Sequence, residues 1–163
     1  KEFNLQYLSG GDVLKEMAKE HGFNSDGDDW WDTEEGMKFL NQREQNSEFD
    51  KNLDKKLTGL FNQGGMVITS YTLPWLIDTG VKIWLDASHE SSTQRMQSRD
   101  NMSSENAYQI TKTRFDKNKA LYKKLYGFSF GEDKDVFDVI INTDNLNANQ
   151  VIDVTAETVR KLI

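Results

Sequence analysis

The sequence predicts an α/β fold in which a parallel β-sheet is flanked by helices. Three short runs, at residues 66–69, 81–85 and 137–141, are apolar along their length instead of alternating, a pattern typical of strands in a buried parallel sheet. Segments with helical spacing separate these runs, and strands that alternate with helices indicate an α/β protein. Residues 5–8 predict a fourth strand, preceded by what we interpret as the frayed end of a helix.

The first half of the chain predicts three consecutive helices. A Gly10-Gly11 turn leads into the first, with Asp12 as the expected N-cap and Gly22 as the end. Because no strand lies between these helices, we expect a helical insert of about residues 12–63 that extends from the sheet. The second helix is expected to begin at Thr33. Ser47 is expected to cap the third helix, and Gly64-Gly65 is expected to end it.

The second half predicts helices at residues 89–99, 103–126 and 147–162. The polar approach to the long middle helix predicts a short lid over about residues 96–114. With no repeat, no low-complexity tract and no long linker, 163 residues are expected to form one domain. The only proline, Pro74, is expected in a loop after the strand at residues 66–69.

Composition excludes several classes of function. The formal net charge is −7, from 20 Lys and Arg against 27 Asp and Glu, whereas a broad nucleic-acid surface needs clustered cations. The chain has no Cys, so it has neither disulfides nor thiolate metal sites, and its two His do not predict a metal site. No apolar run approaches the roughly 20 residues that span a bilayer. We therefore expect a cytoplasmic monomer that binds neither nucleic acid nor membrane.

The turn before the first helix predicts an anion site. Glycines at a helix N-terminus let backbone amides face an anion, and Lys15 lies one turn further along the helix. The alternative is that Gly10 and Gly11 only make a tight turn.

Several basic residues follow the apolar run at residues 81–85, in and beside the predicted lid. Arg95 and Arg99 are four residues apart, and therefore share a helical face, and Arg114 lies on the next helix. Converging cations suit phosphoryl transfer, whose transition state spreads negative charge over phosphate oxygens. The alternative is a solvated face paired with acids such as Asp100 and Asp116.

Two acidic features have alternative interpretations. Asp86 ends a predicted strand, where ligands bind in open α/β sheets, but it could equally cap the next helix. Residues 24–35 approach the pattern of a calcium-binding loop, yet Asp29 stands where that loop requires Gly, and Trp30-Trp31 interrupts it. We do not expect calcium there.

Taken in order, several segments resemble archaeal-type cytidylate kinases, over nearly the whole chain. Leu8-Ser9-Gly10-Gly11-Asp12-Val13-Leu14-Lys15 is similar to the family's acceptor-binding helix start. The other similar segments are residues 48–54, 82–87, 95–99, 121–128 and 137–143.

The resemblance implies a P-loop kinase of three layers that transfers the γ-phosphoryl group of ATP to CMP or dCMP, with Mg²⁺ between the ATP phosphates. It implies no metal ligand from the protein, and Trp75 is expected to pack below the acceptor pocket. By resemblance, Gly11, Asp12 and Lys15 bind the acceptor phosphate, and Asp50 and Asp54 face its base. By the same resemblance, Arg95, Arg99 and Arg114 are catalytic, and Arg95, Asn142 and Thr143 bind ATP. Ser70 and Tyr71 are further expected to contact the acceptor phosphate through their hydroxyls.

The chain also departs from the family. No segment matches the phosphate-binding loop G-x-x-x-x-G-K-[ST], which we expect to precede Lys1 together with the central strand. Thr69-Ser70-Tyr71 stands where relatives carry Glu-Gly-Arg, leaving the hydroxyls of Ser70, Tyr71 and Thr72 for the phosphate, and Leu121 replaces a lid arginine. Two alternatives follow: a catalytically impaired nucleotide-binding or interaction relative, or a kinase for another small acceptor.

Overall fold

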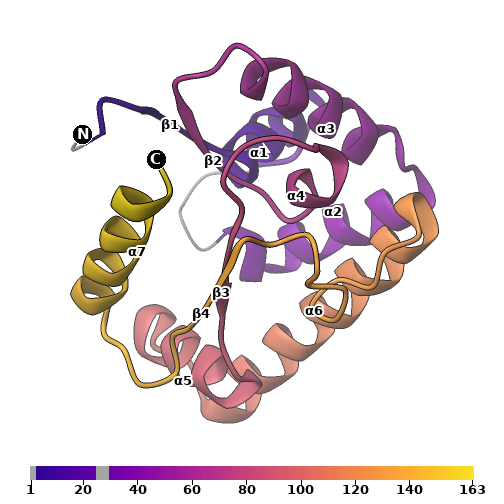
Figure 1. Cartoon of the computed structure of the whole chain (residues 1–163). Helices are drawn as coiled ribbons and strands as arrows, with labels where there is room; N and C mark the ends of the chain where they lie inside the picture. Colours follow the sequence, from indigo (N-terminus) through magenta and orange to yellow (C-terminus); the bar gives the residue numbers. More distant parts are fainter. Residues whose placement is uncertain (1–2, 25–29) are drawn as a thin grey trace. The chain divides into compact units, whose positions relative to one another are not determined.

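The structure is a computed structural model that describes residues 3–24 and 30–163 (Figure 1). The chain divides into two compact units: Lys1–Asp78 with Ala120–Phe130 forms unit 1, and Thr79–Lys119 with Gly131–Ile163 forms unit 2. Each unit contains a pair of parallel strands with helices around it. The α/β class and the parallel pairing are therefore confirmed, whereas the three-layer P-loop arrangement and the single domain stay predictions.

Unit 1 contains the strands β1 and β2 and the predicted helical insert. The strands pair in parallel with Gln6 opposite Met66 and Ser9 opposite Thr69. Thr33 caps the second long helix through its hydroxyl, as predicted. The elements are β1 (Gln6–Ser9), α1 (Gly10–Glu20), the 3₁₀ turn η1 (Trp30–Asp32), α2 (Glu34–Gln45), α3 (Glu48–Phe61), β2 (Met66–Thr69) and α4 (Leu73–Leu76).

The core of unit 1 forms between its helices. Apolar residues at helical spacing on α1 meet those of α3, because both helices turn their apolar faces inward. Phe39 of α2 is fully buried and packs edge-on against Phe49 of α3 at 5.3 Å between ring centroids. Trp30 is 2 % exposed and joins the same cluster, so the paired tryptophans close over the core instead of lying in a solvated loop.

Unit 2 contains the other strand pair, β3 and β4, with Ile83 opposite Val139 and Asp86 opposite Asn142. Asn147 begins the last helix with a capping box shared with Gln150. The elements are β3 (Ile83–Asp86), α5 (His89–Asp100), α6 (Ser104–Tyr126), β4 (Val139–Asn142) and α7 (Ala148–Leu162). Helix α6 belongs to unit 2 up to Lys119 and to unit 1 from Ala120.

Three local predictions were wrong. Ser9, not Asp12, caps α1: its hydroxyl accepts from the Asp12 backbone N–H at 3.2 Å, which places Asp12 in the first turn. Ser47 makes no side-chain cap at α3; the Asn46 side chain accepts from the Glu48 backbone N–H instead. The loop after β2 contains the short helix α4, because Pro74 is well suited to the first turn of a helix.

The strands are also less buried than their apolar sequences predict. Tyr7 and Val67 lie opposite each other in unit 1 and are 67 % and 46 % exposed. In unit 2, Leu85 and Ile140 are about half exposed. Each sheet therefore buries only part of its apolar surface within its own unit. No helix in the described part of the chain is long and apolar enough to span a membrane.

Candidate functional site

In unit 1, the carboxyl ends of the two strands bring two loops together. Ser9 lies opposite Thr69, so α1 begins beside the loop that follows β2. The approach is close: a β-carbon on Gly10 would lie 2.9 Å from the carbonyl oxygen of Thr69 and 3.7 Å from Cα of Ser70. Only glycine fits here without displacement. This strand edge is where α/β proteins bind their ligands.

The start of α1 presents the predicted anion site at this edge. Gly11 and Asp12 are exposed in the first turn, and Lys15 is partly buried one turn later. Trp31 is also near: a β-carbon on Gly11 would lie 4.0 Å from its indole Nε1. The site therefore combines backbone amides, one lysine and an indole edge. The glycines make a close packing contact as well as a turn.

The loop after β2 contains three hydroxyls with different environments. Ser70 accepts hydrogen bonds from the backbone N–H groups of Thr72 and Leu73 at 3.2 and 3.1 Å. Tyr71 is half exposed, with its ring 5.2 Å from that of Phe130. Thr72 is 4 % exposed and donates its hydroxyl to Asp54. Binding of phosphate by Thr72 stays a prediction, and it would require this buried hydroxyl to give up its bond to Asp54.

Asp50 and Asp54, predicted to face an acceptor base, are both buried in α3. The two oxygens of Asp50 accept from the guanidinium of Arg43 at 2.5 and 3.1 Å. Asp54 accepts from the hydroxyls of Thr72 and Tyr126. Burial raises the pKa of Asp54, although these two hydrogen bonds oppose the rise. The base-facing role stays a prediction; a direct contact would have to replace one of these bonds.

In unit 2, the carboxyl ends of β3 and β4 form a second polar edge. The guanidinium of Arg95 donates to the hydroxyl of Thr143 at 3.0 Å and to its carbonyl oxygen at 2.5 Å. Thr143 in turn donates its backbone N–H and its hydroxyl to the carbonyl oxygen of Asp86, both at 2.9 Å. The structure thus brings together two of the predicted ATP-binding residues. Asn142, the third, ends β4 and is exposed.

An open polar pocket of about 540 Å³ lies beside this edge, between α5 and the loop after β4. Asp144 accepts from the backbone N–H of Ser88 at 2.7 Å, and this hydrogen bond is the main cause of its lowered pKa. The pocket therefore has two cations and one anion in its wall. Its lining residues are Ser91, Gln94, Arg95, Ser98, Arg99, Asp144 and Leu146.

The three predicted catalytic arginines have different surroundings. Arg95 and Arg99 line the same pocket, which supports the prediction that they share a helical face. Arg99 also pairs with Asp100 at 2.5 Å, which is the alternative that the sequence left open. Arg114 lies on α6, three residues beyond Thr111, whose hydroxyl is 3.3 Å from that of Thr93 on α5. The convergence of all three stays a prediction.

Asp86 is not the cap of α5. That role belongs to Ser88, whose hydroxyl accepts from the Ser91 backbone N–H at 3.1 Å. The carboxylate of Asp86 accepts from the Trp84 indole and from Lys134, both at 2.9 Å. Burial acts to raise the pKa of Asp86, but these two hydrogen bonds outweigh it and the pKa is lowered. Asp86 therefore stays ionised at the strand edge.

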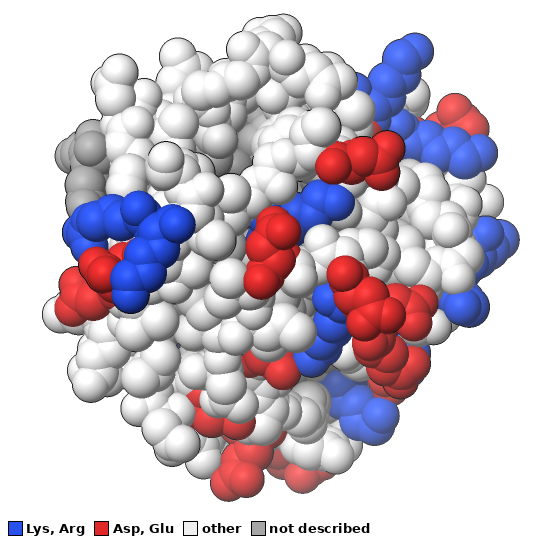
Figure 2. Space-filling model, viewed as in Figure 1, with Lys and Arg blue, Asp and Glu red and all other residues white. Residues whose placement is uncertain are grey.

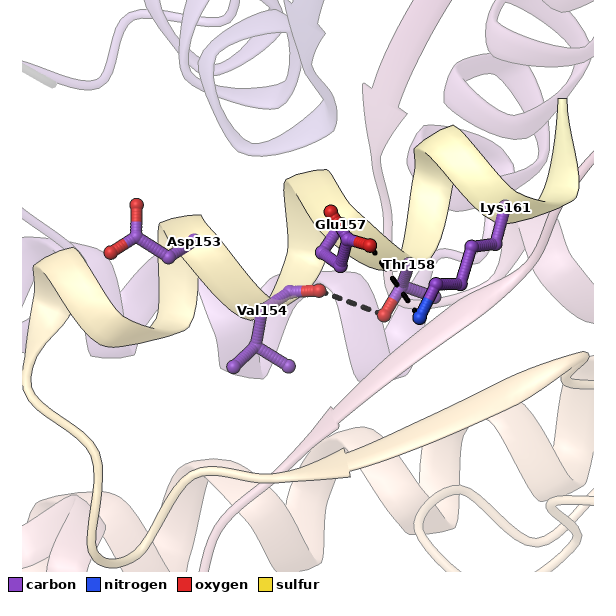
Figure 3. Close-up of a pocket in the computed structure, with 5 residues that line it drawn as sticks. All are labelled: Asp153, Val154, Glu157, Thr158 and Lys161. Atoms are coloured by element: carbon purple, nitrogen blue, oxygen red, sulfur yellow. Dashed lines mark hydrogen bonds and ion pairs between the residues drawn. The ribbon is translucent and has the colours of Figure 1, made fainter.

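The other pocket, of about 440 Å³, lies along α7 and has a different character (Figure 3). Lys161 pairs with Glu157 at 3.5 Å, Thr158 donates to the Val154 carbonyl at 2.8 Å, and Asp153 points away from the others. Because its polar groups bond within one helix, it is a weak candidate. It contains none of the predicted site residues.

The surface charge is mixed on the face shown in Figure 2, where basic and acidic side chains lie beside one another. Among residues 3–24 and 30–163, no cluster of three His, Asp or Glu could hold a metal ion. The calcium-like segment at residues 24–35 lies partly outside the described residues.

Sequence reasoning missed three residues of unit 1: Trp31, beside the start of α1, and Arg43 and Tyr126, which bond the buried carboxylates of α3. Trp31 carried a signal, since paired tryptophans in a polar loop suggest closure over a surface or a base. Arg43 carried none, because arginine is mostly exposed. Tyr126 lies in the family-like segment at residues 121–128, but nothing local indicated its contact with Asp54. Their roles depend on contacts with Asp50 and Asp54, which only the tertiary structure reveals.

Parallel strand pairs with polar loops at their carboxyl ends are typical of α/β proteins that bind ligands at that edge. A model of the cytidylate kinase-like family matches residues 1–145, and the chain belongs to that family. This confirms the resemblance inferred from the sequence.

Individual relatives agree. The cytidylate kinase of Methanocaldococcus jannaschii is 26 % identical over 167 residues, which cover 99 % of this chain and 87 % of that protein. The cytidylate kinase of Thermococcus kodakarensis is 29 % identical over 144 residues, covering 88 % and 68 %. That of Sulfurisphaera tokodaii is 26 % identical over 154 residues, covering 93 % and 79 %.

Proposed function

We propose that the protein is a nucleoside-monophosphate kinase that transfers the γ-phosphoryl group of ATP to CMP or dCMP. The observation that carries this proposal is the family match over residues 1–145. In the reaction, an oxygen of the acceptor phosphate forms a bond to the γ-phosphorus as the bond between that phosphorus and ADP breaks. The products are ADP and the nucleoside diphosphate.

The unit 1 edge is the proposed acceptor site. The phosphate of the nucleotide would bind at the start of α1, where the amides near Gly11 and Asp12 and the Lys15 ammonium favour negative charge. Ser70 and Tyr71 would contact it from the neighbouring loop. Lys15 supplies a point charge and not the two-pronged contact of an arginine, so we expect modest affinity for the acceptor.

The unit 2 edge is the proposed ATP site. Arg95, Asn142 and Thr143 would bind ATP, supported by the Arg95–Thr143 hydrogen bonds and the adjacent pocket of about 540 Å³. Arg95, Arg99 and Arg114 would stabilise the charge on the transferring group. When bound with ATP, Mg²⁺ would neutralise charge on its phosphates. The chain's own residues position the reactants and exclude water.

One observation favours the alternative of a catalytically impaired relative. Leu121, which stands where the family carries a lid arginine, is 3 % exposed and lies in unit 1. Because a leucine side chain carries no charge, the positive charge that the family has at this lid position is lost. The same loss is compatible with a kinase for a different small acceptor. We propose a cytoplasmic monomer in each case.

The test is a panel of acceptors with the full-length protein, ATP and Mg²⁺. CMP, dCMP, UMP, AMP and GMP would be compared by coupled detection of ADP, with product diphosphates identified by chromatography. We expect CMP or dCMP to give the highest kcat/KM. A higher kcat/KM for another nucleotide would mean that this nucleotide, and not CMP or dCMP, is the substrate. If no nucleotide is converted to its diphosphate, the kinase proposal is overturned.

A further inference from the structure

A buried carboxylate connects α3 to the loop that follows β2. Asp54 is 5 % exposed, and one of its oxygens accepts the hydroxyl of Thr72. The other accepts the hydroxyl of Tyr126 at 2.5 Å. Both oxygens are therefore bonded, and each bond joins α3 to a different part of unit 1.

The Thr72 end of this network controls the shape of the loop. The Ser70 hydroxyl accepts from the backbone N–H groups of Thr72 and Leu73 and lies 3.3 Å from the Thr72 hydroxyl. Because Thr72 donates its own proton to Asp54, its oxygen is left to accept from Ser70. A chain of hydrogen bonds thus runs from Ser70 through Thr72 to Asp54, and it fixes the loop between β2 and α4.

The loop lies where the acceptor phosphate is proposed to bind. Its first residues touch the start of α1, as the 3.7 Å from a β-carbon on Gly10 to Cα of Ser70 shows. Displacement of the loop would therefore change the distance between the loop and the amides of α1. Two groups that bind one phosphate must keep such a distance to within a fraction of an ångström.

We propose that Asp54 is a positioning residue which, through Thr72, holds the loop that carries Ser70 and Tyr71 at the acceptor phosphate. The inference rests on the proposed function, and it goes beyond it because it assigns Asp54 a role other than contact with the base. Thr72 is the connecting residue, and Tyr126 bonds the second oxygen of Asp54 without touching the loop.

The geometry separates this role from simple stabilisation. Thr72 and Tyr126 donate to the same carboxylate, so removal of either hydroxyl weakens the same buried group. Only Thr72 belongs to the loop. A purely structural role predicts similar consequences for the two changes, whereas a positioning role predicts that acceptor binding responds to Thr72 alone.

The experiment compares Thr72→Val, Thr72→Ser and Tyr126→Phe in the full-length protein. We expect Thr72→Val to raise the KM for CMP about tenfold with the KM for ATP within about twofold of wild type, since the loop is released. Thr72→Ser keeps the hydroxyl and should restore the KM for CMP. Tyr126→Phe should lower the melting temperature with the KM for CMP within about twofold of wild type.

Three results would overturn the inference. If the wild type phosphorylates CMP and folded Thr72→Val has an unchanged KM for CMP, Asp54 has no positioning role. The proposed function is intact in that case. Equal rises in the KM for CMP in Thr72→Val and Tyr126→Phe indicate a structural role only. Absence of phosphorylation of any nucleotide by the wild type removes the proposed function, and the inference with it.

A second variant covers the case in which Thr72→Val does not fold. Thr72→Ala is smaller and removes the same hydroxyl, and its fold is checked by circular dichroism. Direct titration of CMP in the absence of ATP then reads acceptor binding without catalysis. We expect about tenfold weaker CMP binding by Thr72→Ala than by Thr72→Ser, and equal binding by the two would overturn the inference.

Discussion

Gly36 of α2 lies in backbone contact with Trp30: a β-carbon on Gly36 would come within 2.2 Å of the Trp30 carbonyl oxygen. That carbonyl also accepts the hydroxyl of Thr33 at 2.6 Å, and the same hydroxyl accepts from the Gly36 backbone N–H at 3.2 Å. The 3₁₀ turn η1 and the first turn of α2 therefore form one tightly packed corner. This corner holds the Trp30 side chain in the core of unit 1.

A methyl group at this corner should be costly. We expect Gly36→Ala to lower the free energy of unfolding by about 2–3 kcal/mol, because the backbone must move to admit it. Gly59→Ala in α3 is the matched control, since a β-carbon there meets nothing within 4 Å. The control should raise stability by about 0.5–1 kcal/mol through helix propensity. Urea unfolding measures both, and equal stability of the two variants would contradict the contact.

The contact between Gly10 and β2 leads to a second prediction. A β-carbon on Gly10 would lie 2.9 Å from the Thr69 carbonyl oxygen and 3.2 Å from Cδ1 of Leu57. We expect Gly10→Ala to cost about 1–3 kcal/mol of stability and to weaken CMP binding, since the start of α1 moves away from the neighbouring loop.

The neighbouring glycine provides the control for stability. A β-carbon on Gly11 would lie 3.5 Å from the Ser9 hydroxyl, an ordinary contact. Gly11→Ala should therefore unfold at nearly the same urea concentration as wild type. If Gly10→Ala is as stable as the wild type, α1 and β2 are less closely packed than described.

The sequence predicts those structural features of this protein that depend on residues close to one another in the chain. β2 was predicted with its observed bounds, because its pattern depends on neighbouring residues. The end of α3 was placed too late: the helix ends at Phe61 with Asn62 as its cap, before Gly64-Gly65. The cap of α1 was misassigned because Ser9 and Asp12 are both good capping residues, and only the backbone geometry decides between them.

Contacts between distant residues were not predictable. Asp54 was predicted as a site residue, but its bonds to Thr72 and Tyr126 join positions 18 and 72 residues away. Local patterns contain no information about such pairs. The sequence therefore identified residues at both polar edges, whereas the partners that fix them required the tertiary structure.

Asp54 should make stability depend on pH in an unusual direction. Burial raises its pKa above the ordinary value of 3.8, so the folded state holds the proton more strongly than the unfolded state. Its contribution to stability is complete below that ordinary value and is lost as the pH rises through the folded pKa. The free energy of unfolding of wild type minus that of Asp54→Asn should therefore fall as the pH rises from about 4 towards neutrality.

Asp144 offers the opposite case. Its pKa is lowered, chiefly by the Ser88 backbone N–H, so its contribution is present above the ordinary value of 3.8 and is lost as the pH falls. Urea unfolding of wild type, Asp54→Asn and Asp144→Asn on both sides of pH 3.8 should give two different curves. The Asp54 contribution should decline as the pH rises above 3.8, and the Asp144 contribution should decline as the pH falls below 3.8. Parallel curves would rule out the raised pKa of Asp54.

Arg95 should affect ATP more than the acceptor. Its guanidinium bonds both the hydroxyl and the carbonyl of Thr143 and lines the pocket of unit 2. We expect Arg95→Ala to raise the KM for ATP about tenfold and to lower kcat, with a smaller change in the KM for CMP. Arg160→Ala on α7 is the control, because that side chain pairs with Glu157 outside this pocket. A larger effect on CMP than on ATP would contradict the assignment.

The Arg43–Asp50 ion pair provides the last prediction, since its side chains are only 5 % and 3 % exposed. Arg43→Met leaves the Asp50 carboxylate buried without its donor and should cost about 3–5 kcal/mol. The double change Arg43→Met, Asp50→Leu removes both charges and should recover much of that loss. Arg160→Met breaks an exposed pair with Glu157 and should cost at most about 1 kcal/mol. Additive effects of the two buried changes in urea unfolding would show that the pair is not coupled as its geometry requires.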